Sequence, residues 1–93
     1  MSLGTKLHTA GNHTRWVLDY AKWLLPQETI ASVQVISSSL TMTVDTISTV
    51  LGKEVWFFTA GGVAGEQPTV TVSVTTTIPE TKIDTVDFLV TSP

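Results

Sequence analysis

Apolar and polar residues alternate strictly in residues 69–78 of this chain, which read TVTVSVTTTI. Hydroxyl side chains occupy one parity, and the other holds Val70, Val72, Val74, Thr76 and Ile78. Successive side chains of a strand point to opposite faces, so this period of two places the valines on one buried face. A helix repeats every 3.6 residues and cannot use the pattern. The stretch therefore predicts a half-buried β-strand.

Shorter segments of the same kind fill most of the chain. Residues 29–37 place Ala31, Val33 and Val35 on an expected inner parity, and Leu40 and Met42 begin another alternation. The remaining candidates are residues 47–51, 54–59 and 82–90. About seven short strands at a spacing of roughly 8–12 residues are typical of a sandwich or barrel. We predict an all-β fold, an immunoglobulin-like (Ig-like) antiparallel β-sandwich.

The segment at residues 14–25 fits two patterns. Trp16, Leu18 and Tyr20 alternate as in a strand, whereas Trp16, Tyr20 and Trp23 also share a helical spacing. Pro26 closes the segment and biases Leu25 towards extended geometry. We favour a strand, because the sequence that follows is sheet-like.

Residues 1–14 show neither periodicity and contain glycine and scattered polar side chains. We interpret them as a flexible N-terminal arm, either disordered or ordered against a neighbouring subunit. Residues 15–93 are then the sandwich domain.

Composition excludes several functions. The 93 residues are enough for one domain, and only 14% are charged, with a net charge of −3. Five Lys plus Arg residues provide no basic stripe for nucleic acid. No apolar run approaches the roughly 18 residues of a membrane-spanning helix. The absence of cysteine rules out disulfides and thiolate metal sites.

Residues with catalytic or metal-binding chemistry are few and scattered. His8 and His13 lie in the expected arm and are interpreted as solvated. Asp45, Asp84 and Asp87 are interpreted as solvated or turn-capping carboxylates, with a loop Ca²⁺ site as the minor alternative. Residues 61–65, GGVAG, lack the lysine and the helix of a phosphate loop and predict a sheet turn with glycine at positive φ. We predict a protein that is not an enzyme and that has no cofactor or metal.

Aromatic side chains are the remaining candidates for function. Trp56 and Phe57 are neighbours on a predicted strand, so one of them faces outward. Large side chains that cover the core and its rim are the simplest interpretation, and Trp platforms for sugar rings are another. Buried Trp also dominates protein interfaces. The candidate interface residues are Arg15, Trp16, Trp23 and Trp56.

The order of several short motifs resembles that of a known family. These are DYAKWL at residues 19–24, ETIASV at 28–33, VWFFTAGGVAG at 55–65 and TVTVSVTTT at 69–77. Together they are similar to small Ig-like proteins of tailed bacteriophages and prophages, the fibre–tail adaptor-like proteins.

This resemblance implies a virion structural protein, a tail or fibre adaptor or neck component, assembled in the bacterial cytoplasm. Its expected partners are other phage structural proteins and further copies of itself, with no nucleic acid or membrane. The alternatives are a capsid decoration protein and a glycan- or surface-binding module.

Overall fold

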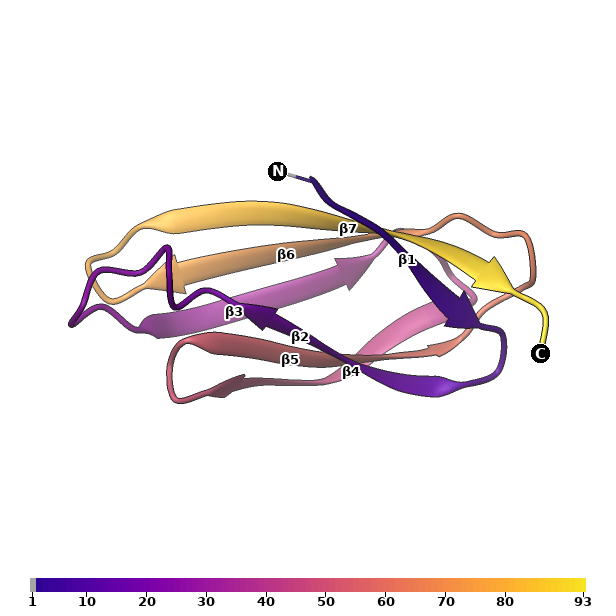
Figure 1. Cartoon of the computed structure of the whole chain (residues 1–93), viewed down its shortest axis with the longest axis horizontal. Helices are drawn as coiled ribbons and strands as arrows, with labels where there is room; N and C mark the ends of the chain where they lie inside the picture. The colour runs from indigo at the N-terminus through magenta and orange to yellow at the C-terminus, as the bar shows by residue number, and fades with distance from the viewer. Residues whose placement is uncertain (1) are drawn as a thin grey trace.

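A computed structural model describes residues 2–93, and these residues form seven strands and no helix. The molecule is elongated, with extents of 43 × 21 × 20 Å, and its strands run along the long axis (Figure 1). The strands are β1 (Ser2–Thr9), β2 (His13–Asp19), β3 (Ile30–Ser37), β4 (Met42–Val50), β5 (Glu54–Gly61), β6 (Thr69–Thr76) and β7 (Thr81–Thr91).

The strands form two facing sheets, and this confirms the predicted all-β sandwich. The larger sheet has the order β1-β7-β6-β3, and the smaller has the order β2-β5-β4. This arrangement is compatible with an Ig sandwich, in which one sheet carries the second, fifth and fourth strands. All pairs are antiparallel except β1 with β7, the first and last strands of the chain.

Strand β6 confirms the alternation seen in the sequence. Val70, Val72 and Val74 are fully buried, and the hydroxyl residues between them are half-buried on the outer face. The pattern does not extend to Ile78, because β6 ends at Thr76 and Ile78 lies exposed in the following turn. The core facing the valines consists mainly of Val55 and Phe57 from β5, Val86, Phe88 and Val90 from β7, Val35 from β3 and Met42 from β4.

Residues 14–25, whose sequence fits both a strand and a helix, form a strand as far as Asp19. Trp16, Leu18 and Tyr20 share the inner parity, as the strand interpretation predicted. Beyond Asp19 the chain turns, with the amides of Trp23 and Leu24 donating to the Tyr20 carbonyl at 3.0 Å. The Asp19 carboxylate accepts the amide of Ala21 at 2.9 Å, which is the local bond that turns favour.

The structure differs from the expectation of a flexible N-terminal arm. Residues 2–9 form β1, which pairs in parallel with β7 from Thr5 opposite Asp87 to Thr9 opposite Thr91. His8 lies on its inner face and is only 1% exposed, so it is not a solvated histidine. Residues 2–9 show no apolar period, because β1 is an edge strand and the side chain that it buries is the polar His8.

The predicted glycine turn is confirmed at the end of β5. Gly61 has a φ of 76°, and a Cβ on it would lie 2.6 Å from the Thr41 carbonyl oxygen. A side chain is therefore excluded both by the backbone conformation and by the close approach of the β3–β4 connection.

Candidate docking surface

The register between β2 and β5 sets which side chains share the outer face of the small sheet. Arg15 pairs with Phe58 and Val17 with Trp56, whereas Trp16 and its partner Phe57 point into the sandwich. Alternation along each strand then leaves Trp56 and Phe58 outward. Two of the four candidate interface residues, Arg15 and Trp56, therefore share one face.

Arg15 and Trp56 are in direct contact. The Arg15 guanidinium carbon lies 4.6 Å from the centroid of the Trp56 ring. The indole is fixed at its edge as well, because its Nε1–H donates to the Glu54 carboxylate at 3.0 Å. A cation over a Trp face contributes about 0.5–1 kcal/mol at an exposed site. These two contacts hold the Trp56 ring in one orientation.

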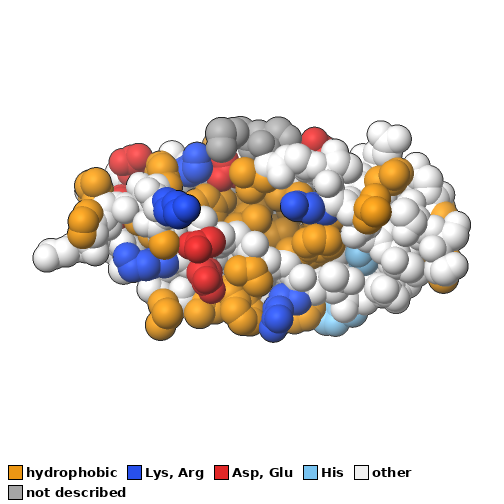
Figure 2. Space-filling view, in the orientation of Figure 1, with side chains coloured by type: hydrophobic (Ala, Val, Ile, Leu, Met, Phe, Trp, Pro, Cys, Tyr) orange, Lys and Arg blue, Asp and Glu red, His pale blue; other side chains and the backbone are white. Residues whose placement is uncertain are grey.

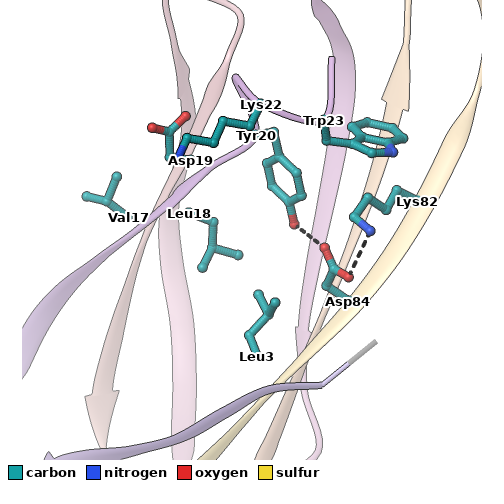
Figure 3. Close-up of a pocket in the computed structure, with 9 residues that line it drawn as sticks. All are labelled: Leu3, Val17, Leu18, Asp19, Tyr20, Lys22, Trp23, Lys82 and Asp84. Atoms are coloured by element: carbon teal, nitrogen blue, oxygen red, sulfur yellow. Dashed lines mark hydrogen bonds and ion pairs between the residues drawn. The ribbon is translucent and has the colours of Figure 1, made fainter. Parts of the chain in front are cut away.

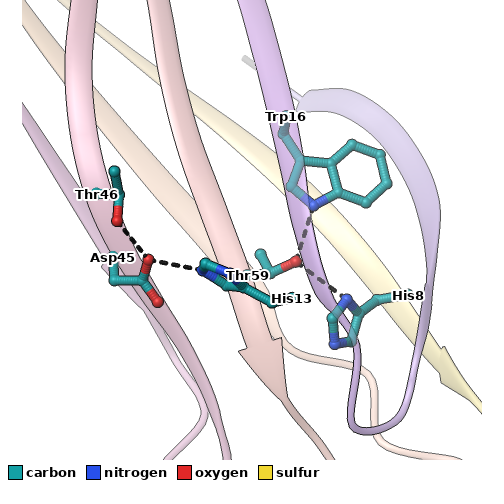
Figure 4. Close-up of polar contacts among 6 residues, drawn as sticks. All are labelled: His8, His13, Trp16, Asp45, Thr46 and Thr59. Carbon is teal, nitrogen blue, oxygen red and sulfur yellow. Dashed lines mark hydrogen bonds and ion pairs between the residues drawn. The ribbon is translucent and has the colours of Figure 1, made fainter.

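A second stacked pair lies beside the first. The rings of His13 and Phe58 stack with centroids 4.6 Å apart and planes inclined by 29°. His13 Nε2 bonds the Asp45 carboxylate at 2.9 Å, and the Thr46 hydroxyl donates to the same oxygen at 2.8 Å (Figure 4). These two bonds, with that from His13 the stronger cause, lower the pKa of Asp45.

We call His13, Arg15, Trp56 and Phe58 the outer cluster. Val17, which pairs with Trp56 and is 43% exposed, extends its apolar area. Sequence reasoning singled out Arg15 and Trp56 but interpreted His13 as a solvated arm residue. Only the pairing of β2 on β5 brings His13 onto Phe58, so the register was the missing information.

Trp16 lies inside the sandwich, in a chain of buried hydrogen bonds (Figure 4). Its indole Nε1–H donates to the Thr59 hydroxyl at 2.8 Å, and this hydroxyl lies 3.0 Å from His8 Nδ1. His8 Nε2 lies 2.9 Å from the Gly61 carbonyl oxygen. A carbonyl can only accept, so Nε2 carries a proton. In the neutral ring Nδ1 is then the acceptor and the Thr59 hydroxyl is the donor. The side-chain polar atoms of Trp16, Thr59 and His8 all have hydrogen-bond partners, and these bonds join β1 to β2 and β5.

Trp23 borders a separate hollow of about 560 Å³ on the side where β2 meets β7 (Figure 3). Its ring meets Tyr20 edge-on at 6.1 Å, and the Lys82 ammonium lies 5.5 Å from its centroid. Leu3 and Leu18 line the same hollow. Trp23 therefore lies at this hollow and not within the outer cluster, and Val17 borders both.

Asp84 lies at the base of this hollow and is fully buried, so it is neither solvated nor a turn cap. Its carboxylate accepts the Tyr20 hydroxyl at 2.9 Å and lies 3.6 Å from the Lys82 ammonium. Burial raises the pKa of the Tyr20 hydroxyl, and the adjacent Asp84 carboxylate raises it further. Asp87 is on the opposite parity, where it accepts the Thr69 hydroxyl at 3.0 Å.

Within residues 2–93, no three His, Asp or Glu side chains lie close enough together to hold a metal ion. The described part of the chain also has no helix long and apolar enough to cross a membrane.

The sequence matches the family model described as podophage GP4 fiber-tail adaptor protein gp77 over residues 9–91, and the chain belongs to this family. The resemblance to phage fibre–tail adaptors is thereby confirmed. A search of curated proteins finds no match. Membership identifies a phage tail structural component, and capsid decoration is not favoured.

Proposed function

We propose that this protein is a non-enzymatic fibre–tail adaptor of the virion, which binds neighbouring tail and fibre proteins through the outer cluster. Family membership motivates the role, and the Arg15–Trp56 contact is the observation that carries the choice of surface. Its Ig-like sandwich is a rigid frame for this surface, and several copies act together in the assembled tail.

The outer cluster has the composition of an interface core. Arg, Trp and Phe are enriched in protein interfaces, and Trp and Arg carry much of the binding energy. Docking normally loses side-chain freedom, about 0.5–1.5 kcal/mol for each side chain that becomes fixed. Arg15 and His13 already hold the two aromatic rings in place, so this loss is smaller here.

The same contacts argue against a glycan-binding module. A sugar ring would need an open indole face, and the Arg15 guanidinium covers one face of Trp56. Trp23 has its own cation, Lys82, over its ring. Protein partners, which can replace or share a cation–π contact, suit both residues better.

The test is incorporation into particles. A phage lacking the gene is complemented with the wild-type chain or with Trp56→Ala, and banded particles are analysed by quantitative mass spectrometry. We expect a fixed copy number for the wild-type chain that matches the symmetry of the tail. The copy number of Trp56→Ala should be much lower, because loss of an interface hot spot weakens binding about 30-fold.

Ile36→Ser is the matched control, because Ile36 is 53% exposed on the outer face of the other sheet. Its copy number should equal that of the wild-type chain. Absence of the wild-type chain from clean particles would reject the adaptor function. Normal incorporation of Trp56→Ala would reject the outer cluster as the docking surface.

A further inference from the structure

Four of the strands in residues 2–93 are edge strands: β1 and β3 in the large sheet, and β2 and β4 in the small one. Three of them contain an extra residue, which shifts the register between residues 2 and 5 in β1, 30 and 32 in β3, and 45 and 48 in β4. Native proteins use such bulges to block the pairing of an exposed edge with another chain. Strand β2 instead pairs with β5 in one unbroken register from His13 to Asp19. It is therefore the only regular edge among the described strands.

The outer edge of β2 directs backbone groups away from β5. Residues of an antiparallel pair alternate between those that exchange hydrogen bonds with the partner strand and those whose N–H and C=O face away from it. The Tyr20 amide donates to the Lys53 carbonyl at 2.9 Å and continues the register of β2 on β5. The even-numbered residues of β2 thus face β5, and the amides and carbonyls of Arg15 and Val17 face outward. These groups are a template for a further strand.

Charged side chains that project from an edge strand also discourage pairing. In β2 these side chains have partners within the chain. The Arg15 guanidinium carbon lies 4.6 Å from the centroid of the Trp56 ring, and the Asp19 carboxylate accepts the Ala21 amide at 2.9 Å. Both charges are directed to groups of this chain, so they do not protect the edge.

The hollow of about 560 Å³ in Figure 3 opens beside this edge, at the last three residues of β2. Its apolar wall consists of Leu3, Val17, Leu18, Tyr20 and Trp23. Figure 2 shows hydrophobic side chains gathered in the middle of the face that carries β1 and β2. An added strand at β2 would therefore have an apolar recess beside it.

The charges in the hollow balance. Four charged residues line it, two of each sign: Asp19, Lys22, Lys82 and Asp84. The buried Asp84 carboxylate accepts the Tyr20 hydroxyl at 2.9 Å and lies 3.6 Å from the Lys82 ammonium, so its charge is compensated. The hollow therefore suits a bulky side chain without charge.

We propose that an extended segment of a neighbouring tail or fibre protein pairs with the edge of β2 as an added strand. Successive side chains of a strand point to opposite faces. One set would continue the outer face beside Arg15 and Val17, and the other would point towards the hollow, where one uncharged side chain enters. Val17 borders both the outer cluster and the hollow, so a single segment covers both. The proposal rests on the adaptor function and deepens it, because it defines the conformation of the partner.

A second copy of this chain fits the edge less well. Its own β2 would have to supply the side chains that point towards the hollow. These are Trp16 and Leu18, which already pack against the core of their own sandwich. A single extended segment has no such core, and its side chains are available.

Val17→Pro removes an outward amide and leaves the bonds to β5 in place, because an edge strand tolerates proline where its N–H faces solvent. Val17→Ala is the matched control, since it shortens the same side chain and keeps the amide. Leu3→Trp is a second variant, which fills the hollow from β1 without a change in β2. Thermal melts first establish that each variant is folded. The purified chains are then added to particles assembled without this protein and co-sedimented.

We expect Val17→Pro to bind about tenfold more weakly than Val17→Ala, because a carbonyl of the added strand loses its donor. Leu3→Trp should also bind more weakly than the wild-type chain. In hydrogen-exchange mass spectrometry, the Arg15 and Val17 amides should exchange rapidly in the free chain and slowly in particles. Equal exchange in the two states would overturn the proposal even if Val17→Pro did not fold.

The remaining outcomes separate this proposal from the adaptor function. Normal binding of Val17→Pro and Leu3→Trp, with weak binding of Trp56→Ala, would reject the added strand and keep the outer cluster. A dimer of the purified chain that Val17→Pro abolishes, with particle binding unchanged, would assign the edge to a second copy instead. Failure of the wild-type chain to bind particles would remove the adaptor function, and the added strand with it.

Discussion

The Tyr20 hydroxyl donates a hydrogen bond to the buried Asp84 carboxylate at 2.9 Å and so joins the two sheets. Tyr20 follows the last residue of β2 in the small sheet, and Asp84 belongs to β7 in the large one. Both residues line the hollow of Figure 3, where the bond is drawn.

Tyr20→Phe should lower the free energy of unfolding by about 1–3 kcal/mol, because the buried carboxylate loses a partner that water cannot replace. Denaturant melts of Tyr20→Phe, of Asp84→Ala, which removes the acceptor, and of the double variant give the coupling between the two residues. A coupling below about 0.5 kcal/mol, the usual additivity error, would show that the bond adds little.

Strand β1 should be part of the cooperative fold. His8→Ala removes the bonds to Thr59 and Gly61 and should cost about 1–3 kcal/mol of unfolding free energy. Its neighbour Leu7 is 65% exposed on the other parity, so Leu7→Ala should change stability by less than about 0.5 kcal/mol. Equal stabilities for the two variants would mean that β1 does not depend on its inner side chain.

Two glycines separate backbone conformation from close contact. Gly65 has a φ of 91° with nothing within 4 Å of an added Cβ, whereas at Gly61 that Cβ would lie 2.6 Å from the Thr41 carbonyl oxygen. Gly65→Ala should lower the free energy of unfolding by about 1 kcal/mol, because the left-handed backbone alone disfavours alanine. Gly61→Ala should lower the free energy of unfolding by more than this in thermal or denaturant melts, because the close contact with Thr41 adds to the backbone cost. If Gly65→Ala were the more destabilising, the close contact would not matter.

Acid should destabilise the fold through three carboxylates whose pKa values are lowered in the native state. A Thr76 hydroxyl bond is the main cause at Glu28, the His13 bond at Asp45, and the Ser39 hydroxyl bond at Glu66. Because their native pKa values lie below the ordinary ones, the unfolded chain binds more protons at low pH. The stabilisation is complete above the ordinary values of 3.8 for Asp and 4.5 for Glu, and it is lost as pH falls through the native values.

Unfolding free energies between pH 7 and pH 2 check this expectation. Glu66→Gln, which no longer titrates, should show a shallower loss of stability below pH 4 than the wild-type chain. Glu80→Gln is the control, because Glu80 is an exposed residue of the β6–β7 turn. A wild-type chain whose stability does not change below pH 4 would contradict the three assignments.

The sequence predicted the elements whose alternation is local and regular. Strand β6 follows its pattern over its whole length, but Ala31 is exposed because a bulge between Ile30 and Ser32 shifts the parity and buries Ile30 instead. Leu40 is exposed for a simpler reason, since β4 begins only at Met42. A bulge such as the one between Ile30 and Ser32 adds a single residue, and this cannot be recognised in a short alternation of apolar and polar residues.

The candidate site was less predictable because it depends on pairing between distant segments. Arg15 and Phe58 are opposite each other only after β2 has chosen its register on β5. The parallel pairing of β1 with β7 joins residues about as far apart as the chain allows, and no local pattern encodes it. Arg15 and Trp56 could be singled out as residue types, but their contact could not.

The parallel alignment of β1 and β7 also determines how the molecule would carry force. Both strands run away from the end that holds the β2–β3, β4–β5 and β6–β7 connections, and Thr9 and Thr91 lie side by side towards the opposite end (Figure 1). Tension between the two ends would act along the strands and across their ladder hydrogen bonds, which are slanted between β1 and β7 and perpendicular to the strands in the antiparallel pairs. These bonds would then be loaded together in shear instead of opening one after another.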